Sequence, residues 1–370
     1  ARAVQALPEK GRPKIVGITG TNGKSTTTAL IGHILKEAGR DVRIGGNIGT
    51  GVLDMAPLNA NAVYVLELSS YQLDLVDSLR CDVSVLLNIS PDHLDRHGGM
   101  DGYVEAKKRI FANQRTRDVA VLGIDDPHAQ SIAMSRKRPG EARVVQISSE
   151  FGLARGVSAV DGHLYDSTGG QAIRVGDLAE AEALPGRHNY QNAAAAYAAC
   201  HALGVPPDRI MAGIRSFPGL AHRMEIVGEI EGVRFVNDSK ATNAQAAEQA
   251  LKTWPKVHWI AGGVAKTDGI KPLAPWFDRV HQAYLIGESE VDFTKTLKGK
   301  TKTVSCGTLE AATQAAFDAA KASNETHPIV LLSPACASFD QFKDFEARGD
   351  AFKGIVRRLA AQVAPQKEAV

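Results

Sequence analysis

Nine residues near the start of the chain, Thr-Gly-Thr-Asn-Gly-Lys-Ser-Thr-Thr at positions 19–27, constrain the fold more than any other segment. They follow an apolar run at 14–19 that predicts a buried strand, and they precede a pattern that predicts a helix over 25–38. A glycine-rich turn between a strand and a helix, ending in Lys-Ser, is the context that a phosphate-binding loop requires. The sequence therefore predicts an α/β fold that binds a nucleoside triphosphate.

The residue types in this loop each suit a phosphate group. Glycines at 20 and 23 let backbone N–H groups turn toward phosphate oxygens, Lys24 brings positive charge to the β- and γ-phosphates, and the Ser25 hydroxyl can ligate Mg²⁺. The common motif has glycine where this chain has Ile18, and no Asn-Lys-x-Asp guanine motif is present. That absence disfavours a GTPase and leaves a kinase or a ligase. Nucleotide contacts are predicted for Gly20, Thr21, Asn22, Gly23, Lys24, Ser25 and Thr26.

Short apolar runs alternate with helical patterns along the first two thirds of the chain, which is typical of a mostly parallel sheet with crossover helices. Predicted strands are 14–19, 62–68, 83–89 and 119–124, and predicted helices are 25–38, 103–113 and the alanine-rich 189–203. Their near-continuous Val, Ile and Leu content suits strands that are buried on both faces. The stretch 144–175 is richer in Gly, Ser and Asp, and it predicts short antiparallel strands.

The alternation starts again after Phe-Pro-Gly at 217–219, which predicts a second, Rossmann-like α/β domain. Its predicted strands are 233–236, 257–261, 283–286 and 329–332, and its predicted helices are 243–252, 309–322 and 345–359. We therefore expect two domains, one at 14–219 and one at 220–370, preceded by a short segment at 1–13.

Composition excludes several classes of protein. A net charge of +2, from 43 basic and 41 acidic residues, gives no electrostatic basis for binding nucleic acid or an anionic membrane. The four cysteines are scattered, which favours reduced thiols and a cytoplasmic protein. No apolar run reaches the 18 or so residues that a membrane helix needs, and no secretory signal is recognisable.

Further motifs follow the loop in a fixed order. They are Gly-Gly-Asn-Ile-Gly at 45–49, Glu-Leu-Ser-Ser-Tyr-Gln-Leu at 67–73, Asn-Ile-Ser-Pro-Asp-His-Leu-Asp-Arg-His at 88–97, Leu-Pro-Gly-Arg-His-Asn at 184–189 and Asn-Asp-Ser-Lys-Ala-Thr-Asn at 237–243. Together with the Thr-Asn form of the loop, they resemble the Mur ligase family, which also includes folylpolyglutamate synthetases. The resemblance covers nearly the whole chain and implies ATP as the nucleotide. It also implies that 1–13 is a linker remnant, that 14–219 is a central ATP-binding domain and that 220–370 is a C-terminal amino-acid-binding domain.

A metal site is expected at the edge of the first sheet. Glu67 ends a predicted strand, where ligands gather in open α/β sheets, and a carboxylate beside a phosphate loop suits Mg²⁺. The resemblance implies that His93 ligates a second Mg²⁺, and that Lys107, rather than its neighbour Lys108, is a carbamylated lysine. Taken alone, Lys107 would be read as a solvent-facing side chain, and a lone histidine is more often structural. The predicted metal ligands are Ser25, Glu67, His93 and Lys107, and the predicted catalytic residues are Lys24, His93, Lys107 and Arg223.

The resemblance also implies the remaining contacts. Asn189 and Asn192 are expected near the adenine, although Asn189 could instead cap its helix. Arg223 is expected to reach the ATP phosphates, and Asp238 lies in a segment expected to contact the ribose. The chain lacks the Asp-Asn-Pro-Arg motif of diaminopimelate- and lysine-adding relatives, and its C-terminal motif at 332–349 resembles that of D-glutamate-adding members. Substrate contacts are therefore expected for Asn47, Ser69, Lys240, Thr242, Lys266, Ser338 and Phe345.

The implied activity joins D-glutamate to UDP-N-acetylmuramoyl-L-alanine through an acyl phosphate, in the synthesis of peptidoglycan precursors. We expect two Mg²⁺ ions, a monomer, closure of the second domain before chemistry, and the absence of the family's N-terminal uridine-binding domain. Two alternatives stay open at this point. One is a ligase for another amino acid, or a folylpolyglutamate synthetase, and the other is a nucleotide-binding module without complete activity.

Overall fold

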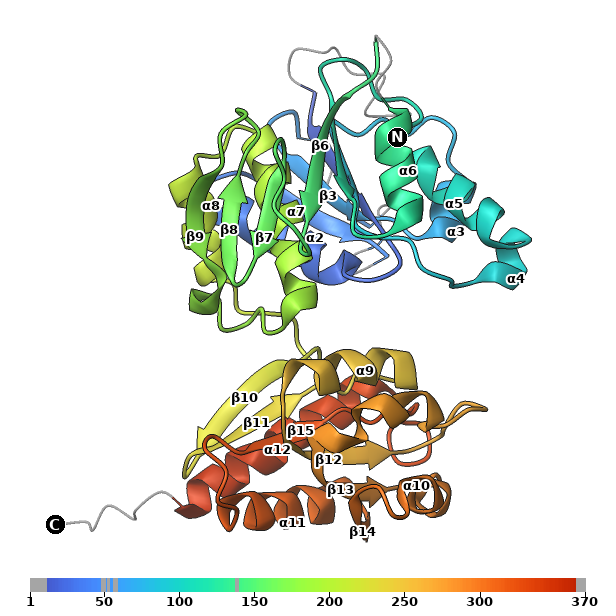
Figure 1. The fold of residues 1–370 in the computed structure, drawn as a ribbon, viewed down its shortest axis with the longest axis vertical. Coiled ribbons are helices and arrows are strands. Elements are labelled where there is room, and N and C mark those ends of the chain that lie inside the picture. The colour runs from blue at the N-terminus through green and yellow to red at the C-terminus, as the bar shows by residue number, and fades with distance from the viewer. Residues whose placement is uncertain (1–11, 48–50, 52–53, 56–58, 137–139, 364–370) are drawn as a thin grey trace, which may run out of the picture. The chain divides into compact units, whose positions relative to one another are not determined.

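The computed structural model describes residues 12–47, 51, 54–55, 59–136 and 140–363 (Figure 1). These residues form two compact units, 1–218 and 219–370, and each is described by itself. Most of the expected linker at 1–13 and the last two residues of the motif at 45–49 lie outside the described residues. No helix in the described part of the chain is long and apolar enough to cross a membrane.

The first unit is built on a nine-stranded sheet in the order β2-β3-β1-β4-β5-β6-β7-β8-β9. The strands from β2 to β7 pair in parallel, and β8 and β9 are added antiparallel. The strands are β1 (Lys14–Thr19), β2 (Val42–Gly46), β3 (Val63–Glu67), β4 (Val83–Leu86), β5 (Val119–Gly123), β6 (Arg143–Ser148), β7 (Val157–Val160), β8 (His163–Asp166) and β9 (Ile173–Asp177).

Helices cover both faces of this sheet (Figure 1). One face packs against α2 (Lys24–Glu37), α7 (Arg187–Ala202) and α8 (Pro207–Arg215). The other packs against α3 (Ser70–Asp74), α5 (Met100–Lys108), the 3-10 helix η1 (Arg109–Phe111) and α6 (Pro127–Ser135). The short α4 (Leu94–His97) and η2 (Leu178–Glu180) complete the unit.

Period-two burial explains why the central strands are apolar throughout. On β1, Val16 and Ile18 join the core beneath α2 and α7, whereas Ile15 joins the core on the opposite face. Each of these side chains is almost completely buried. The predicted parallel sheet with strands buried on both faces is thus confirmed.

The second unit holds a six-stranded sheet in the order β10-β11-β15-β12-β13-β14, parallel except for the β10–β11 hairpin. Its strands are β10 (Glu225–Ile230), β11 (Val233–Asn237), β12 (Val257–Gly262), β13 (Val280–Ile286), β14 (Lys302–Gly307) and β15 (Ile329–Leu332). One face packs against α9 (Ala244–Thr253), η3 (Lys271–Arg279) and α10 (Glu290–Leu297), and the other against α11 (Leu309–Lys321) and α12 (Phe345–Val363). The predicted Rossmann-like arrangement is confirmed.

One part of the prediction for the first sheet is wrong. The stretch 144–175 was expected to hold only antiparallel strands, but β6 pairs in parallel with both β5 and β7. Antiparallel pairing begins only at β7 and β8. Most of the Gly, Ser and Asp residues in this stretch lie between the strands, although Ser148, Ser158 and Asp166 lie within them. The β6 residues Val145 and Ile147 are buried in the core of the parallel sheet.

Candidate active site

The phosphate-binding loop lies at the carboxyl end of β1 and leads directly into α2, as the sequence predicts. Gly23 is the N-cap of α2 and has a φ of 82°, a left-handed conformation that favours glycine. A Cβ atom on Gly23 would lie 2.2 Å from the Asn192 Oδ1 atom on α7. Glycine is therefore favoured here both by the backbone conformation and by the close approach of the Asn192 side chain.

Replacing Gly23 with alanine is expected to distort the loop and weaken Mg-ATP binding at least tenfold, as measured by calorimetric titration. Gly39 provides a matched control at the other end of α2, because its φ is 78° and a Cβ atom there would meet nothing within 4 Å. Both variants carry the conformational cost of a left-handed alanine, about 1–2 kcal/mol. Only Gly23→Ala should lose nucleotide, and equal binding by the two variants would contradict this role for the loop.

Hydrogen bonds to the segment after β4 hold the loop in place. The Thr21 hydroxyl donates to the Ser90 carbonyl oxygen (3.1 Å) and accepts from the Ser90 N–H (3.0 Å). The Asn22 N–H donates to Asn88 Oδ1 (2.9 Å). Thr21 and Asn22, both predicted to contact nucleotide, therefore also fix the shape of the loop.

Two lysine ammonium groups converge on one backbone carbonyl in this loop. Lys24 Nζ donates to the carbonyl oxygens of Gly20 (3.0 Å) and Thr21 (2.9 Å), and Lys107 Nζ donates to the same Gly20 oxygen (2.8 Å). Lys107 is only 1% exposed. Burial, and then the charge of Lys24, lower the Lys107 pKa to about 7, although Asp92 acts in the opposite direction. Two cations this close favour the binding of an anion beside them.

The carboxylate of Glu67 lies at the end of β3, next to β1, with Glu67 in register with Ile18. Its side chain is buried, and Oε1 accepts a hydrogen bond from Asn47 Nδ2 (3.1 Å). Oε2 is buried and has no hydrogen-bond partner among the described residues. A buried carboxylate oxygen without a donor is costly unless a cation satisfies it, so Glu67 fits a Mg²⁺ ion.

His93 lies in the segment after β4 and is the N-cap of α4, with a φ of 52°. Its side chain is half exposed, with Nδ1 3.4 Å from the Tyr71 hydroxyl and Nε2 3.5 Å from Asp92 Oδ2. A non-glycine residue in a left-handed conformation commonly marks a functional site. Ser25 and Thr26 lie in the first turn of α2, beside the loop.

Asn189 and Asn192 form a chain of amide contacts that braces α7 against α2. The Thr27 hydroxyl donates to Asn192 Oδ1 (3.1 Å), Asn192 Nδ2 donates to Asn189 Oδ1 (2.9 Å), and Asn189 Nδ2 donates to the Pro185 carbonyl oxygen (2.7 Å). The alternative that Asn189 caps its helix is wrong. Helix α7 begins at Arg187 with Gly186 as its N-cap, so Asn189 lies inside the first turn.

Two predicted substrate residues of the first unit have clear structural partners. Asn47 orients Glu67, as described above. Ser69 is the N-cap of α3, where its hydroxyl accepts from the Gln72 N–H (3.2 Å) and the Gln72 side chain accepts from the Ser69 N–H (2.9 Å). This reciprocal capping box gives Ser69 a role in positioning the segment after β3.

A polar network at the same edge of the sheet was missed by the sequence reasoning. Asn88 Nδ2 donates to Gln191 Oε1 (2.8 Å), and Gln191 Nε2 donates to Asp125 Oδ2 (3.0 Å). Asp125 also accepts hydrogen bonds from Ser148 and Ser149. Asn88 and Asp125 each lie shortly after a buried strand, and this position at a carboxyl end was the signal that could have identified them.

The second unit has its own cluster at the carboxyl ends of β11 and β15. Asp238 is buried, accepts a hydrogen bond from the Ser333 hydroxyl (2.8 Å) and accepts another from the Met224 N–H (3.2 Å). Burial raises the Asp238 pKa to about 7, against the opposing effects of the Ser333 hydrogen bond and the Arg223 charge. Arg223 and Asp238 are therefore close enough to interact electrostatically.

The predicted amino-acid contacts lie on neighbouring loops of this unit. Lys240 Nζ stands 4.7 Å from the centroid of the Phe345 ring, and half-buried Thr242 follows two residues later. A bridge between Val264 and Ala337 pairs the segment that carries exposed Lys266 with the segment that carries buried Ser338.

Buried Arg348 lies in the C-terminal motif, but the sequence reasoning assigned it no role. Its guanidinium donates to the Ser239 hydroxyl (3.0 Å), the Ser239 carbonyl (2.8 Å) and the Cys336 carbonyl (3.0 Å). Burial lowers the Arg348 pKa to about 10. Arg348 therefore joins the loop after β11 to the loop after β15, and positions both.

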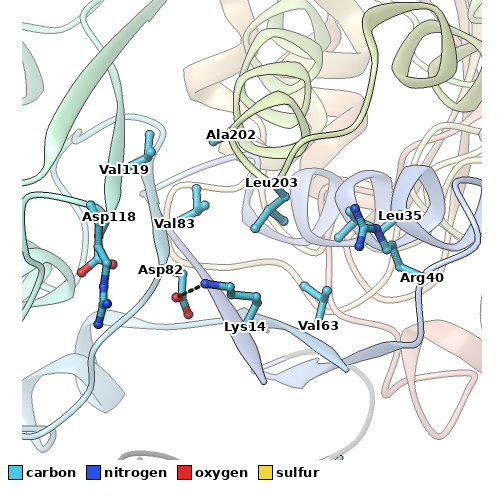
Figure 2. Close-up of a pocket in the computed structure, with 11 residues that line it drawn as sticks. Lys14, Leu35, Arg40, Val63, Asp82, Val83, Asp118, Val119, Ala202 and Leu203 are labelled. Carbon is cyan, nitrogen blue, oxygen red and sulfur yellow. Dashed lines mark hydrogen bonds and ion pairs between the residues drawn. The ribbon is translucent and has the colours of Figure 1, made fainter. Parts of the chain in front are cut away.

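A pocket in the first unit lies at the opposite edge of the sheet from the phosphate loop (Figure 2). Four of its lining residues, Lys14, Val63, Val83 and Val119, are the first residues of β1, β3, β4 and β5. Lys14 forms an ion pair with Asp82 there (3.0 Å). Because the loop lies at the carboxyl ends of the same parallel strands, this pocket is separate from the candidate active site.

Comparisons with known proteins agree with this geometry. Residues 18–200 match the Mur ligase middle domain, and residues 222–336 match the Mur ligase glutamate ligase domain. A UDP-N-acetylmuramoylalanine--D-glutamate ligase from Caulobacter sp. (strain K31) is 58% identical over 98% of this chain and 77% of that protein. Its counterpart from Rhodospirillum rubrum is 55% identical over 93% of this chain and 72% of that protein.

Solved structures are similar in fold at low sequence identity. MurF from Acinetobacter baumannii has a TM-score of 0.66 at 19% identity, covering 94% of this chain and 77% of that chain. The UDP-N-acetylmuramate-alanine ligase MurC from Thermotoga maritima has a TM-score of 0.65 at 18% identity, covering 98% of this chain and 78% of that chain. Since two matching domains and relatives at more than half identity span nearly all of the sequence, the chain belongs to the Mur ligase family.

Proposed function

We propose that this chain is an ATP-dependent ligase that adds D-glutamate to UDP-N-acetylmuramoyl-L-alanine, a cytoplasmic step of peptidoglycan precursor synthesis that serves cell shape and division. The observation that carries the proposal is 58% identity, over 98% of the chain, to a protein named for this reaction. The convergence of Lys24 and Lys107 on one carbonyl, beside a buried acidic side chain, supports a nucleotide site at that edge of the sheet. In this proposal residues 14–219 bind ATP and residues 220–370 bind the amino acid.

The residues of the first unit fit a magnesium nucleotide. Glu67, Ser25, His93 and a modified Lys107 would hold two Mg²⁺ ions, and Asn189 and Asn192 would border the adenine. When bound, Mg²⁺ would neutralise negative charge on the phosphate oxygens. Lys24 adds a further positive charge at the phosphates, and Arg223 and Asp238 of the second unit are assigned to the phosphates and the ribose.

A buried lysine with a low pKa is suited to carbamylation. The neutral amine nitrogen of Lys107 attacks the carbon of CO₂, loses a proton and becomes an anionic carbamate. At pH 7 a pKa of about 7 leaves roughly half of the amines neutral, against about 1 in 3,000 at the ordinary pKa. The carbamate replaces a buried cation with an oxygen ligand suited to Mg²⁺.

The reaction has two steps. A carboxylate oxygen of the UDP-linked substrate attacks the γ-phosphorus of ATP, and the bond from that phosphorus to the oxygen shared with the β-phosphate breaks. ADP departs, and the substrate carboxylate becomes an acyl phosphate. The D-glutamate amine then attacks the acyl carbon and loses a proton, and inorganic phosphate departs as the amide forms. Most of the protein's contribution to both steps is positioning and charge stabilisation.

The second unit offers groups that suit a dicarboxylate. Lys240 and Lys266 provide two cations, and Thr242 and Ser338 provide hydroxyl donors. Phe345, whose ring contacts the Lys240 ammonium, would hold that cation in place. A screen with radiolabelled amino acids tests the assignment: D-glutamate alone should enter the product, and incorporation of another amino acid would indicate a different member of the family.

Ser338→Ala is expected to raise the KM for D-glutamate about tenfold, consistent with the loss of one hydrogen bond to a charged group. Mg-ATP affinity should not change, because Ser338 is not among the residues assigned to the nucleotide. Steady-state kinetics and calorimetry measure the two effects. The exposed helical hydroxyl of Thr294 provides a control, and Thr294→Ala should alter neither constant. Equal losses of ATP and D-glutamate binding in Ser338→Ala would instead assign Ser338 to packing.

A further inference from the structure

Three potential metal ligands meet at the amino-terminal edge of the second sheet. His258 is the second residue of β12, His281 is the second residue of β13, and Glu325 lies in the segment before β15. One ligand atom from each of the three side chains lies within 4.8 Å of the others. The candidate amino-acid site occupies the opposite, carboxyl-terminal edge of these parallel strands, so the cluster is separate from the proposed reaction.

His258 is completely buried, and its Nε2 atom has no hydrogen-bond partner among the described residues. That atom faces Glu325 Oε2 across 4.0 Å, too far for a hydrogen bond. Nδ1 of the same ring is 3.1 Å from the Tyr284 hydroxyl, and this contact fixes the orientation of the ring. A buried ring nitrogen that points at a carboxylate without a hydrogen bond is an unsatisfied polar group.

The other two side chains complete the arrangement. His281 Nδ1 lies 2.8 Å from Glu325 Oε1, and the rings of His281 and His258 are stacked with their centroids 4.8 Å apart. Burial, and then the nearby His281, lower the His258 pKa to about 4, so this imidazole is neutral at physiological pH and keeps a lone pair for a metal. His281 and Glu325 are partly exposed, so a metal ion and a coordinating water can enter from solvent.

We propose that His258, His281 and Glu325 bind a divalent transition-metal ion, with Zn²⁺ as the best fit, at a site remote from the Mg-ATP site. Two imidazoles and one carboxylate, with a fourth position left for water, form a ligand set that suits zinc. Tetrahedral bonds of about 2.0–2.1 Å would separate the ligand atoms by about 3.3 Å, which small side-chain rotations can reach from the observed distances. The bound ion would join β12, β13 and the segment before β15.

The test uses the 370-residue chain without nucleotide, in buffer with excess Mg²⁺, which prefers oxygen ligands and leaves an imidazole site open. Zn²⁺ is titrated against a chromogenic chelator, and the melting temperature is recorded with and without Zn²⁺. The wild-type chain should bind one Zn²⁺ at this site and melt at a higher temperature when Zn²⁺ is present. His281→Gln and Glu325→Gln should each bind at least tenfold more weakly and lose most of the melting shift.

These two positions are partly exposed, so their variants should fold, and the melting temperature without Zn²⁺ checks this directly. His163→Gln is the matched control, because His163 Nδ1 lies 3.7 Å from Asp177 Oδ2 in a pair that has no second histidine ligand in the described part of the chain. It should bind Zn²⁺ as the wild type does. The proposal is overturned if the wild-type chain shows no stoichiometric binding, or if His281→Gln and Glu325→Gln retain wild-type affinity. Neither outcome affects the proposed ligase activity.

Discussion

Lys107→Ala is expected to reduce ligase turnover by at least about 100-fold, because it removes the amine whose carbamate would ligate Mg²⁺ in the nucleotide site. Added short carboxylates such as acetate should restore part of the activity, since they supply the missing oxygen ligand. Steady-state turnover with and without acetate measures both effects. Intact-mass analysis of the wild-type enzyme should show the mass of one added CO₂ when the sample is kept in bicarbonate.

The neighbouring residue provides the matched control. Lys108 lies one position along the same helix, is partly exposed and pairs with Glu105. Lys108→Ala should therefore retain nearly full activity. Fully active wild-type enzyme with an unmodified Lys107 would contradict the carbamate. The carbamate would also be contradicted if no carboxylate rescued Lys107→Ala and Lys108→Ala lost activity strongly.

The pH dependence of the modification follows from the same amine. Burial and the charge of Lys24 lower the Lys107 pKa to about 7, so the reactive neutral form is lost as the pH falls through 7. At a fixed total bicarbonate concentration, carbamate occupancy should fall as the pH drops below that point and level off above it, because both the neutral amine and the release of a proton on carbamylation favour higher pH. Bicarbonate-dependent activity of the wild type, measured from pH 5.5 to 9, should therefore fall on the acidic side of pH 7. A carbamate occupancy that is independent of pH would contradict this prediction.

Lys24→Ala is the second substitution with a large expected effect. It removes the charge assigned to the β- and γ-phosphates, and a loss of about 10²- to 10³-fold in turnover is expected from the removal of one such group. Mg-ATP affinity, measured by calorimetry, should also fall. Lys36 is exposed in the last turn of the same helix, and Lys36→Ala should leave both quantities unchanged. Near-normal affinity and turnover in Lys24→Ala would show that the loop does not hold the phosphates.

The sequence was most informative where strands are buried on both faces. The predicted strands 14–19 and 329–332 coincide with β1 and β15. In an α/β fold, a short apolar run between turn residues can form little other than a buried strand. Edge strands were harder to predict. β10 and β14 expose much of their length, and their mixed polar sequences carry no strong period, so neither was identified.

The site shows a similar division between local and long-range information. The position of the phosphate loop and of Glu67 followed from local patterns, because strand ends and helix starts are visible in the sequence. The partners of these residues are separated widely along the chain: Lys107 reaches Gly20, Gln191 reaches Asn88, and Arg348 reaches Ser239. Such contacts depend on tertiary packing, and for this reason the low pKa of Lys107 and the role of Arg348 could not be predicted.

Release of inorganic phosphate tests the ligase assignment most directly. The protein is incubated with Mg-ATP and with UDP-N-acetylmuramoyl-L-alanine and D-glutamate, supplied together, singly, or with L-glutamate in place of the D-isomer. Phosphate should appear above background only when the UDP-linked substrate and D-glutamate are both present, in equal amount to the amide product. Phosphate release that is independent of D-glutamate, or equally fast with L-glutamate, would contradict the proposed function.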